Sequence, residues 1–177
     1  MLLDMHIIPP LWYYNRMNIA FIDTQNLHLG TKTEGWIADH KKLRIYLRDK
    51  YNIQEAYCFF GYTKVEYATL YSRLQRVGYI VQFKESNEEM ASQKKGNVDV
   101  DLVFYAMEAL IERDDFEKIF IVSGDGDYYR LIRYLINKKR FGRILFPNKN
   151  RSSLYKRIAD EYIVYLSTIK HKIEHLN

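Results

Sequence analysis

Short apolar runs alternate along the chain with segments in which apolar residues recur at helical spacing. The runs are rich in β-branched and aromatic residues, which predicts buried strands at residues 18–22, 53–62, 79–83, 120–122, 143–147 and 161–166. The helical spacing predicts helices at residues 42–51, 65–77, 98–113, 128–136 and 154–159. Strands that alternate with helices imply right-handed crossovers, so we expect an α/β fold with a mostly parallel central sheet covered on both faces.

One folded domain is expected to account for most of the chain. A length of 177 residues is close to the usual size of a single domain. Residues 1–16 show no clear period, so we treat them as an N-terminal extension of unknown role. We place the domain at residues 17–168 and a C-terminal tail at residues 169–177. Residues 84–97 are polar and charged, which predicts a long exposed loop.

The composition is that of an ordinary globular protein in a reducing compartment. Hydrophobic residues make up 47% of the chain and charged residues 28%, and no apolar run is long enough to span a bilayer, so we expect no membrane partner. A single cysteine, Cys58, excludes an internal disulfide and favours a cytoplasmic setting. Because it lies within an apolar run, we expect a buried structural thiol.

The net charge of +5 is distributed unevenly along the chain. Residues 128–177 contain 12 Lys and Arg against 3 Asp and Glu, a local balance of +9, whereas residues 1–127 contain 15 against 19, a balance of −4. A strongly basic C-terminal third is suited to a polyanionic partner such as RNA. The alternative is a solvated surface on which basic residues cluster without a ligand.

Four aspartates stand where the predicted sheet would bring them together. Asp23 directly follows the first strand, Asp125 and Asp127 follow the strand at 120–122, and Asp99 begins a helix. Ligands of open α/β sheets bind beyond the carboxyl ends of the strands, so these carboxylates are expected to share one crevice. Several acids in one crevice repel one another unless a cation neutralises them, and Mg²⁺ or Mn²⁺ suits oxygen ligands. Phosphodiester cleavage is a coherent function for such a site.

Each of these residues also has a purely structural interpretation. Asp23 can cap the turn that follows it, and Asp127 can cap the helix that begins at Tyr128. Asp99 at a helix N-terminus is stabilised by the helix dipole without any metal. Lys94 and Lys95, which precede that helix, can be solvated loop residues rather than ligands of a phosphate.

Four short motifs, in order, resemble those of NYN domains of the LabA type, a branch of the PIN-like nuclease superfamily. They are NIAFID at 18–23 with Asn26, KGNVDV at 95–100, VSGDGDY at 122–128, and the pairs SL at 153–154 and AD at 159–160. The resemblance extends over nearly the whole chain. It implies a three-layer α/β/α PIN-like fold, a metal-dependent RNase activity, and functional residues at Asp23, Asn26, Asp99, Asp125 and Asp127. The expectation of a homodimer rests on the resemblance alone.

The sequence departs from the family at one position. Members often carry a further acid about six residues after the one that Asp99 matches, and here that residue is Tyr105. Asp101 is a poor substitute for this acid, because it lies two positions after Asp99, about 200° around the helix axis, and so points in a different direction. Either the set of acids is reduced and the activity is weak or absent, or Asp23, Asp99 and Asp125 suffice for activity.

The leading hypothesis is a Mg²⁺- or Mn²⁺-dependent endoribonuclease. Asp23, Asp99 and Asp125 would hold the metal, while Asn26 and Asp127 would orient water or substrate. RNA phosphates would be attracted by seven basic residues: Lys94, Lys95, Arg130, Arg133, Arg151, Lys156 and Arg157.

Two other functions remain as alternatives. A catalytically weak or inactive NYN module would bind RNA and regulate without cleaving it. A phosphatase of the haloacid-dehalogenase kind also uses acids at strand ends, but the segment 23–25 lacks the second aspartate expected two residues after the nucleophile.

Overall fold

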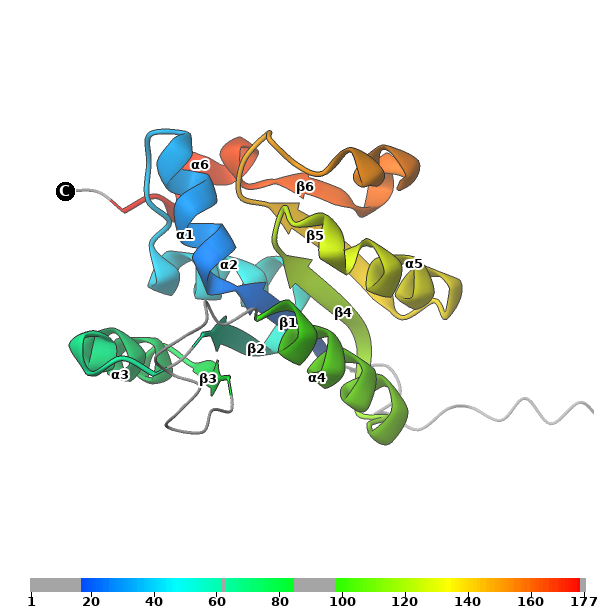
Figure 1. Ribbon diagram of the computed structural model, residues 1–177, viewed down its shortest axis with the longest axis horizontal. Helices are drawn as coiled ribbons and strands as arrows, with labels where there is room; N and C mark the ends of the chain where they lie inside the picture. Colours follow the sequence, from blue (N-terminus) through cyan, green and yellow to red (C-terminus); the bar gives the residue numbers. More distant parts are fainter. Residues whose placement is uncertain (1–16, 62, 85–97, 176–177) are drawn as a thin grey trace, which may run out of the picture.

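A single parallel sheet organises the molecule. The computed structural model describes residues 17–61, 63–84 and 98–175, and six strands in this part form one sheet in the order β3-β2-β1-β4-β5-β6 (Figure 1). Every pair of neighbouring strands is parallel. The strands are β1 (Met17–Asp23), β2 (Ile53–Phe60), β3 (Tyr79–Phe83), β4 (Phe116–Val122), β5 (Phe141–Phe146) and β6 (Ile163–Tyr165). The predicted α/β fold with a parallel sheet is confirmed.

Helices cover both faces of the sheet, which gives the three-layer α/β/α architecture. Of the helices in the described residues, α4 and α5 pack on one face, and α1, α2, α3 and α6 pack on the opposite face (Figure 1). The helices are α1 (Thr24–Thr33), α2 (His40–Tyr51), α3 (Ala68–Arg76), α4 (Asp99–Glu112), α5 (Tyr129–Asn137) and α6 (Lys170–Ile173).

The two central strands are buried on both faces. In β1, Ile19 and Phe21 point into the core beneath α4 and α5, while Ala20 and Ile22 point into the core on the opposite face. Strand β4 alternates in the same way. A strand covered on both sides needs apolar residues at consecutive positions, which explains the apolar runs at 19–22 in β1 and 119–122 in β4.

The order of the strands creates a crevice between β1 and β4. From β1 the chain builds outward through β2 and β3, then returns to β4 on the other side of β1 and builds outward again through β5 and β6. Helix α1 therefore leaves β1 toward one face, and α5 leaves β4 toward the other. Such a switch point at the carboxyl ends of parallel strands is where open α/β sheets bind their ligands.

Several elements differ from the sequence prediction. The ten-residue helix α1 was not predicted, because only Leu27 among its apolar residues is buried and the segment has little apolar periodicity. The helix predicted at 65–77 divides into a 3-10 turn, η2 (Val65–Tyr67), and α3. The helix predicted at 154–159 is a 3-10 helix, η4 (Ser153–Arg157), and further 3-10 turns are η3 (Gly126–Tyr128), η5 (Asp160–Tyr162) and η6 (Leu166–Ile169).

The segment assigned to a C-terminal tail packs onto the domain as far as the structure describes it. Ile173 in α6 is fully buried beside α2, and Glu174 pairs with Ala38 in an isolated antiparallel bridge. The predictions for residues 1–16 and for the loop at 85–97 lie outside the described residues. In the described part of the chain, no helix combines the length and the apolar character needed to cross a membrane.

Candidate metal centre and cleft

A cleft of about 340 Å³ opens at the carboxyl ends of β1 and β4. Its floor carries three of the predicted aspartates, and its walls carry amide side chains from α1 and from the loop after β5. The cleft is lined by Asp23, Gln25, Asn26, Leu29, Gly30, Thr33, Val98, Asp99, Gly124, Asp125, Asn148 and Asn150. The structure thus places predicted site residues from three separate segments in one depression.

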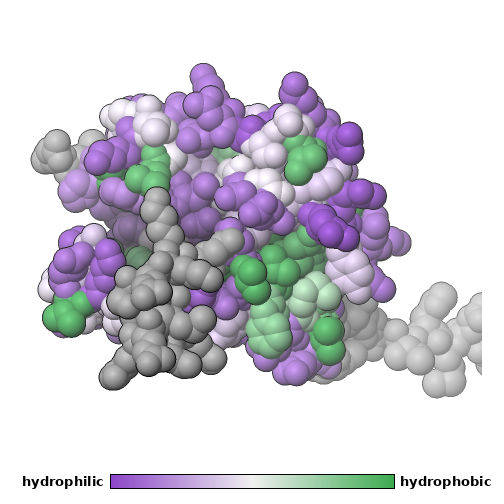
Figure 2. Space-filling model, viewed as in Figure 1, coloured by the Kyte–Doolittle hydropathy of each residue, from purple (hydrophilic) through white to green (hydrophobic). Residues whose placement is uncertain are grey.

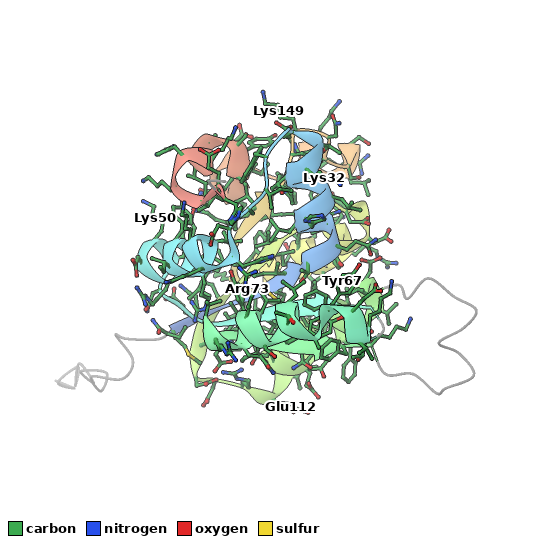
Figure 3. All side chains as sticks on the ribbon, turned by 90° about the vertical axis from the view of Figure 1, so that its left-hand side faces the viewer. Lys32, Lys50, Tyr67, Arg73, Glu112 and Lys149 are labelled. Atoms are coloured by element: carbon green, nitrogen blue, oxygen red, sulfur yellow. The ribbon has the colours of Figure 1, made fainter. Side chains whose placement is uncertain are left out.

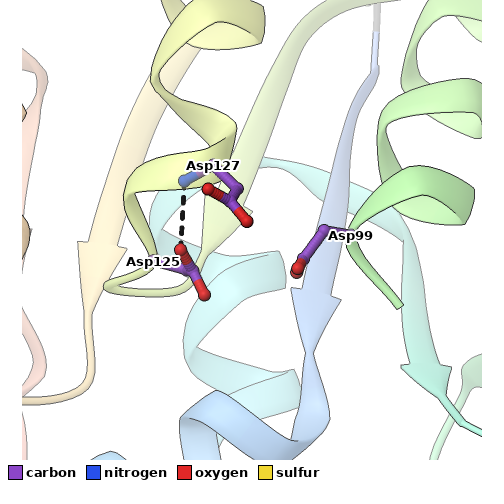
Figure 4. A group of neighbouring side chains, drawn as sticks. All are labelled: Asp99, Asp125 and Asp127. Atoms are coloured by element: carbon purple, nitrogen blue, oxygen red, sulfur yellow. Dashed lines mark hydrogen bonds between the residues drawn. The ribbon is translucent and has the colours of Figure 1, made fainter. Parts of the chain in front are cut away.

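Three carboxylates converge at this cleft. Asp99, Asp125 and Asp127 each offer an oxygen, and these oxygens all lie within 4.8 Å of one another (Figure 4). Asp99 comes from the first turn of α4, whereas the other two come from the turn between β4 and α5. The side chain of Asp125 also accepts the backbone N–H of Asp127 at 3.0 Å. Asp125, not Asp127, is therefore the residue that caps the turn, and no capping bond is formed by Asp127.

The chemistry of this triad fits Mg²⁺ or Mn²⁺. All donors are hard carboxylate oxygens, and the three side chains bring three negative charges into a space of a few ångströms. Carboxylate oxygens of this kind are the ligands that hard divalent cations prefer in proteins. Asp99, Asp125 and Asp127 are the residues that would hold the ion.

Asp23 is the buried member of the four predicted aspartates. Its side chain is only 6% exposed, and one carboxylate oxygen accepts the backbone N–H of Asn26 at 2.9 Å. Asp23 is therefore the N-cap of α1, as its structural interpretation predicted, while also lining the cleft. Burial, followed by the negative charge of Asp99, raises the pKa of Asp23, although the hydrogen bond from Asn26 opposes the shift. Its oxygens do not belong to the group within 4.8 Å.

A tyrosine that the sequence did not single out connects the buried and exposed acids. The hydroxyl of Tyr128 lies 3.3 Å from Oδ2 of Asp23 and also contacts Oδ1 of Asp99. Burial raises the pKa of Tyr128 far above its ordinary value, so the hydroxyl stays protonated and has one proton to donate. It can satisfy only one carboxylate at a time. The only sequence signal was its position directly after the acidic turn.

Asn26 holds the acidic turn in place. Its Oδ1 accepts the backbone N–H of Gly124 at 2.8 Å, which ties the start of α1 to the turn after β4. The buried Ser123 accepts the backbone N–H of Asp125 at 3.1 Å, and the hydroxyl of Tyr155 donates to the carbonyl of Asp125. Asp125 is therefore fixed by contacts from several elements.

Comparison with known proteins identifies the domain. The sequence profile of the NYN domain matches residues 18–168, which is most of the chain. The chain belongs to the NYN domain family. It is 23% identical over 152 residues to the low amplitude and bright protein LabA of Synechococcus elongatus, covering 81% of this chain and 80% of LabA, and it is of the LabA type.

The fold is shared with a solved structure. A protein of unknown function from Vibrio parahaemolyticus superposes with a TM-score of 0.70 at 18% sequence identity. The similarity covers 91% of this chain and 98% of the Vibrio chain. At this identity the likeness establishes a common fold.

Tyr105, at the position where the resemblance led us to expect a further acid, has a packing role. The hydroxyl of Tyr105 donates to Oε1 of Gln82 at 3.2 Å, and its ring lies edge-on to Phe59, 5.4 Å between centroids. Tyr105 therefore connects α4 to the edge of the sheet. Asp101 does not join the acidic triad, in agreement with its expected direction on the helix. One of its oxygens is buried without a hydrogen-bond partner.

The predicted phosphate-binding residues lie outside the cleft or outside the described residues. Lys94 and Lys95 lie outside the described residues. Among the described residues, none of the five remaining cations lines the cleft. The guanidinium of Arg151 lies over the rings of Phe146 and Tyr165, at 5.2 and 5.7 Å from their centroids. The others are exposed on α5 and η4: Arg130, Arg133, Lys156 and Arg157.

Proposed function

We propose that this NYN domain is a Mg²⁺- or Mn²⁺-dependent ribonuclease that hydrolyses RNA phosphodiester bonds. The observation that carries the proposal is the triad of Asp99, Asp125 and Asp127, of which Asp99 and Asp125 line an open cleft, on a fold whose family belongs to the PIN-like nucleases. Membership of the family supports a nuclease, and the donor set supports a divalent cation. RNA as the substrate rests on the basic C-terminal third of the chain.

In this proposal, the carboxylates bind the cation, and other side chains bind the RNA. A divalent cation bound by the triad supplies charge neutralisation at a phosphate and activation of water. Without it, the carboxylates repel a phosphate, so substrate binding in the cleft depends on the cation. Neutral amides on the walls, from Gln25, Asn148 and Asn150, can hydrogen-bond to sugar hydroxyls and bases of a single strand. Exposed cations on α5 and η4 attract the flanking backbone.

An RNA-binding module without catalytic activity is the second candidate. It is favoured by one observation, the use of Tyr105 for packing where many relatives carry an acid. Such a module would bind RNA through the basic surface with a strong salt dependence, and added Mn²⁺ would produce no cleavage.

The deciding experiment measures cleavage of a labelled single-stranded RNA with Mn²⁺, Mg²⁺ or EDTA. Asp125→Asn is the test variant, because Asn also caps helices well and preserves the turn while removing a charged ligand. We expect its rate to fall about 100-fold or more, since metal ligation supplies several kcal/mol of transition-state stabilisation.

Asp114→Asn is the matched control for this experiment. Asp114 is an exposed acid before β4, at the opposite end of the sheet from the cleft. The Asp114→Asn substitution makes the same chemical change as Asp125→Asn, and the variant should cleave RNA at the wild-type rate. Equal cleavage by wild type and Asp125→Asn would contradict the proposed site. Salt-sensitive RNA binding without cleavage by any of the proteins would favour the non-catalytic module.

A further inference from the structure

Helix α4 presents a stripe of large apolar side chains to solvent. Val100, Phe104 and Ile111 are 70%, 62% and 75% exposed, and they lie within about 40° of one another around the helix axis. The core residues of α4, Leu102 and Ala106, lie on the other side of the axis. Figure 2 shows hydrophobic residues gathered over α4 on this face of the molecule. A solvent-facing side of a helix is normally polar, so the stripe indicates a partner.

The chain itself contains a segment of matching character. Ten of the sixteen residues before β1 are apolar or aromatic, two more are prolines, and only Asp4 and Arg16 carry a full charge at neutral pH. A segment of this composition is too apolar to be a typical solvated tail. It is therefore chemically suited to cover an apolar stripe.

The first described residue after this segment lies near the end of α4. Met17, the first residue of β1, pairs with Phe116 of β4, and Phe116 follows the end of α4 at Glu112 by four residues. The side chain of Met17 packs against the same core cluster as α4. The chain thus enters β1 close to the end of α4 that carries Ile111. Figure 3 shows Glu112 at this end of the molecule, far from Lys149 beside the cleft.

Length and tethering favour the chain's own segment over a separate partner. The stripe from Val100 to Ile111 is about 16 Å long, whereas sixteen residues can span up to about 50 Å. A tethered segment has an effective concentration in the millimolar range, so a modest apolar contact suffices to hold it. A second copy of the chain needs about 800 Å² per partner for a stable interface, and a stripe one side chain wide offers far less.

We infer that residues 1–16 bind along the α4 stripe of the same molecule, with Val100, Phe104 and Ile111 as the docking surface. Binding covers the apolar side of the helix that carries Asp99 at its first turn. The docking surface is separate from the metal triad and does not depend on the proposed nuclease activity.

Site-specific photo-crosslinking of the full chain tests this docking. A thiol-reactive benzophenone is attached at Phe104→Cys or Ile111→Cys, which keeps an aromatic apolar group on the stripe. The native Cys58 is fully buried, and burial raises its pKa to about 12, so it should not be labelled. Val65→Cys is the matched control, because Val65 is equally apolar, is 93% exposed and lies on η2, away from α4. Thermal unfolding verifies that each labelled protein is folded.

After irradiation, the cross-linked peptides are mapped by mass spectrometry. We expect both stripe positions to cross-link to peptides from residues 1–16 within the monomer band, at a yield several-fold above the control and independent of protein concentration. A dimer band that grows with concentration would show a second copy on the stripe and overturn the inference. Yields equal to that of the control, or cross-links only to other segments, would overturn it as well.

Discussion

Replacing Asp23 with asparagine should stabilise the protein in the absence of divalent cations. The Asp23 carboxylate is buried, and its Oδ2 accepts only a long contact of 3.5 Å from the hydroxyl of Ser123 and shares the single proton of Tyr128 with Asp99. In Asp23→Asn, the side-chain oxygen can still accept the N–H of Asn26, because Asn caps helices as well as Asp. The new amide can donate to the oxygen of Tyr128, which frees the hydroxyl to donate to Asp99. The substitution therefore removes a buried charge and gives Tyr128 both a donor and an acceptor, at the loss of the 3.5 Å contact from Ser123.

The size of the effect follows from the cost of an incompletely paired buried charge. That cost is about 1–3 kcal/mol, and each kcal/mol shifts the melting temperature of a protein of this size by about 2–4 °C. Because the folded-state pKa of Asp23 is raised, its contribution to stability is present below the ordinary carboxyl pKa of about 4 and is lost as pH rises through the folded-state value. The advantage of asparagine should therefore grow with pH.

Thermal unfolding with EDTA at about pH 8 and about pH 5 measures this prediction. Asp23→Asn should melt at a higher temperature than wild type at the higher pH, with a smaller difference at the lower pH, while Asp114→Asn should match wild type at both. A lower melting temperature at pH 8, or a difference that does not shrink on acidification, would refute the reasoning. Added Mn²⁺ should raise the melting temperature of wild type more than that of Asp23→Asn, if Asp23 contributes to metal binding as the sequence predicted.

Two further predictions concern the framework of the sheet. Gly142→Ala should destabilise the protein by about 1–3 kcal/mol in denaturant titrations, because a Cβ there would overlap with the buried ring of Phe120. An unfolding midpoint equal to that of wild type would contradict this close approach. Gly35→Ala is the comparison variant, because Gly35 has free space around it but a positive φ, so it tests backbone strain alone. Arg44→Met should lower stability by about 3 kcal/mol or more in the same titration, since the Arg44 guanidinium donates to three backbone carbonyls, those of Ile53, Gln54 and Gly78. A loss below about 1 kcal/mol would show that these carbonyls find other partners.

Apolar patterns predicted the strands and most of the helices, because each of these elements buries a periodic set of side chains. The same logic failed at α1, where Asp23 starts the helix through a capping bond and the buried face consists largely of threonine and glycine. The pattern also gave no order for the strands, since every buried strand has similar composition. That order places β1 beside β4 and so creates the crevice.

Within the site, residue type and position were predictable, but the direction of each side chain was not. The sequence assigned the metal to Asp23, Asp99 and Asp125, whereas the carboxylates that converge in the structure are those of Asp99, Asp125 and Asp127. The roles of the neighbouring residues depend on contacts across the crevice. Asp125 proves to be the cap that was considered for Asp127, and Asn26 accepts a hydrogen bond from Gly124, distant in sequence. Such contacts appear only once β1, β4 and α4 are placed together.

The acids of the cleft fall into an inner and an outer layer with different energetic roles. Asp23 is buried and tied to the backbone of α1, whereas Asp127 is exposed to solvent and makes no capping bond. The inner acid lowers stability as it ionises, because burial raises its pKa. Tyr128 connects the layers with one proton for two carboxylates. A cation at the outer triad would relieve repulsion in both layers, so cation binding and folding stability should rise together in this domain.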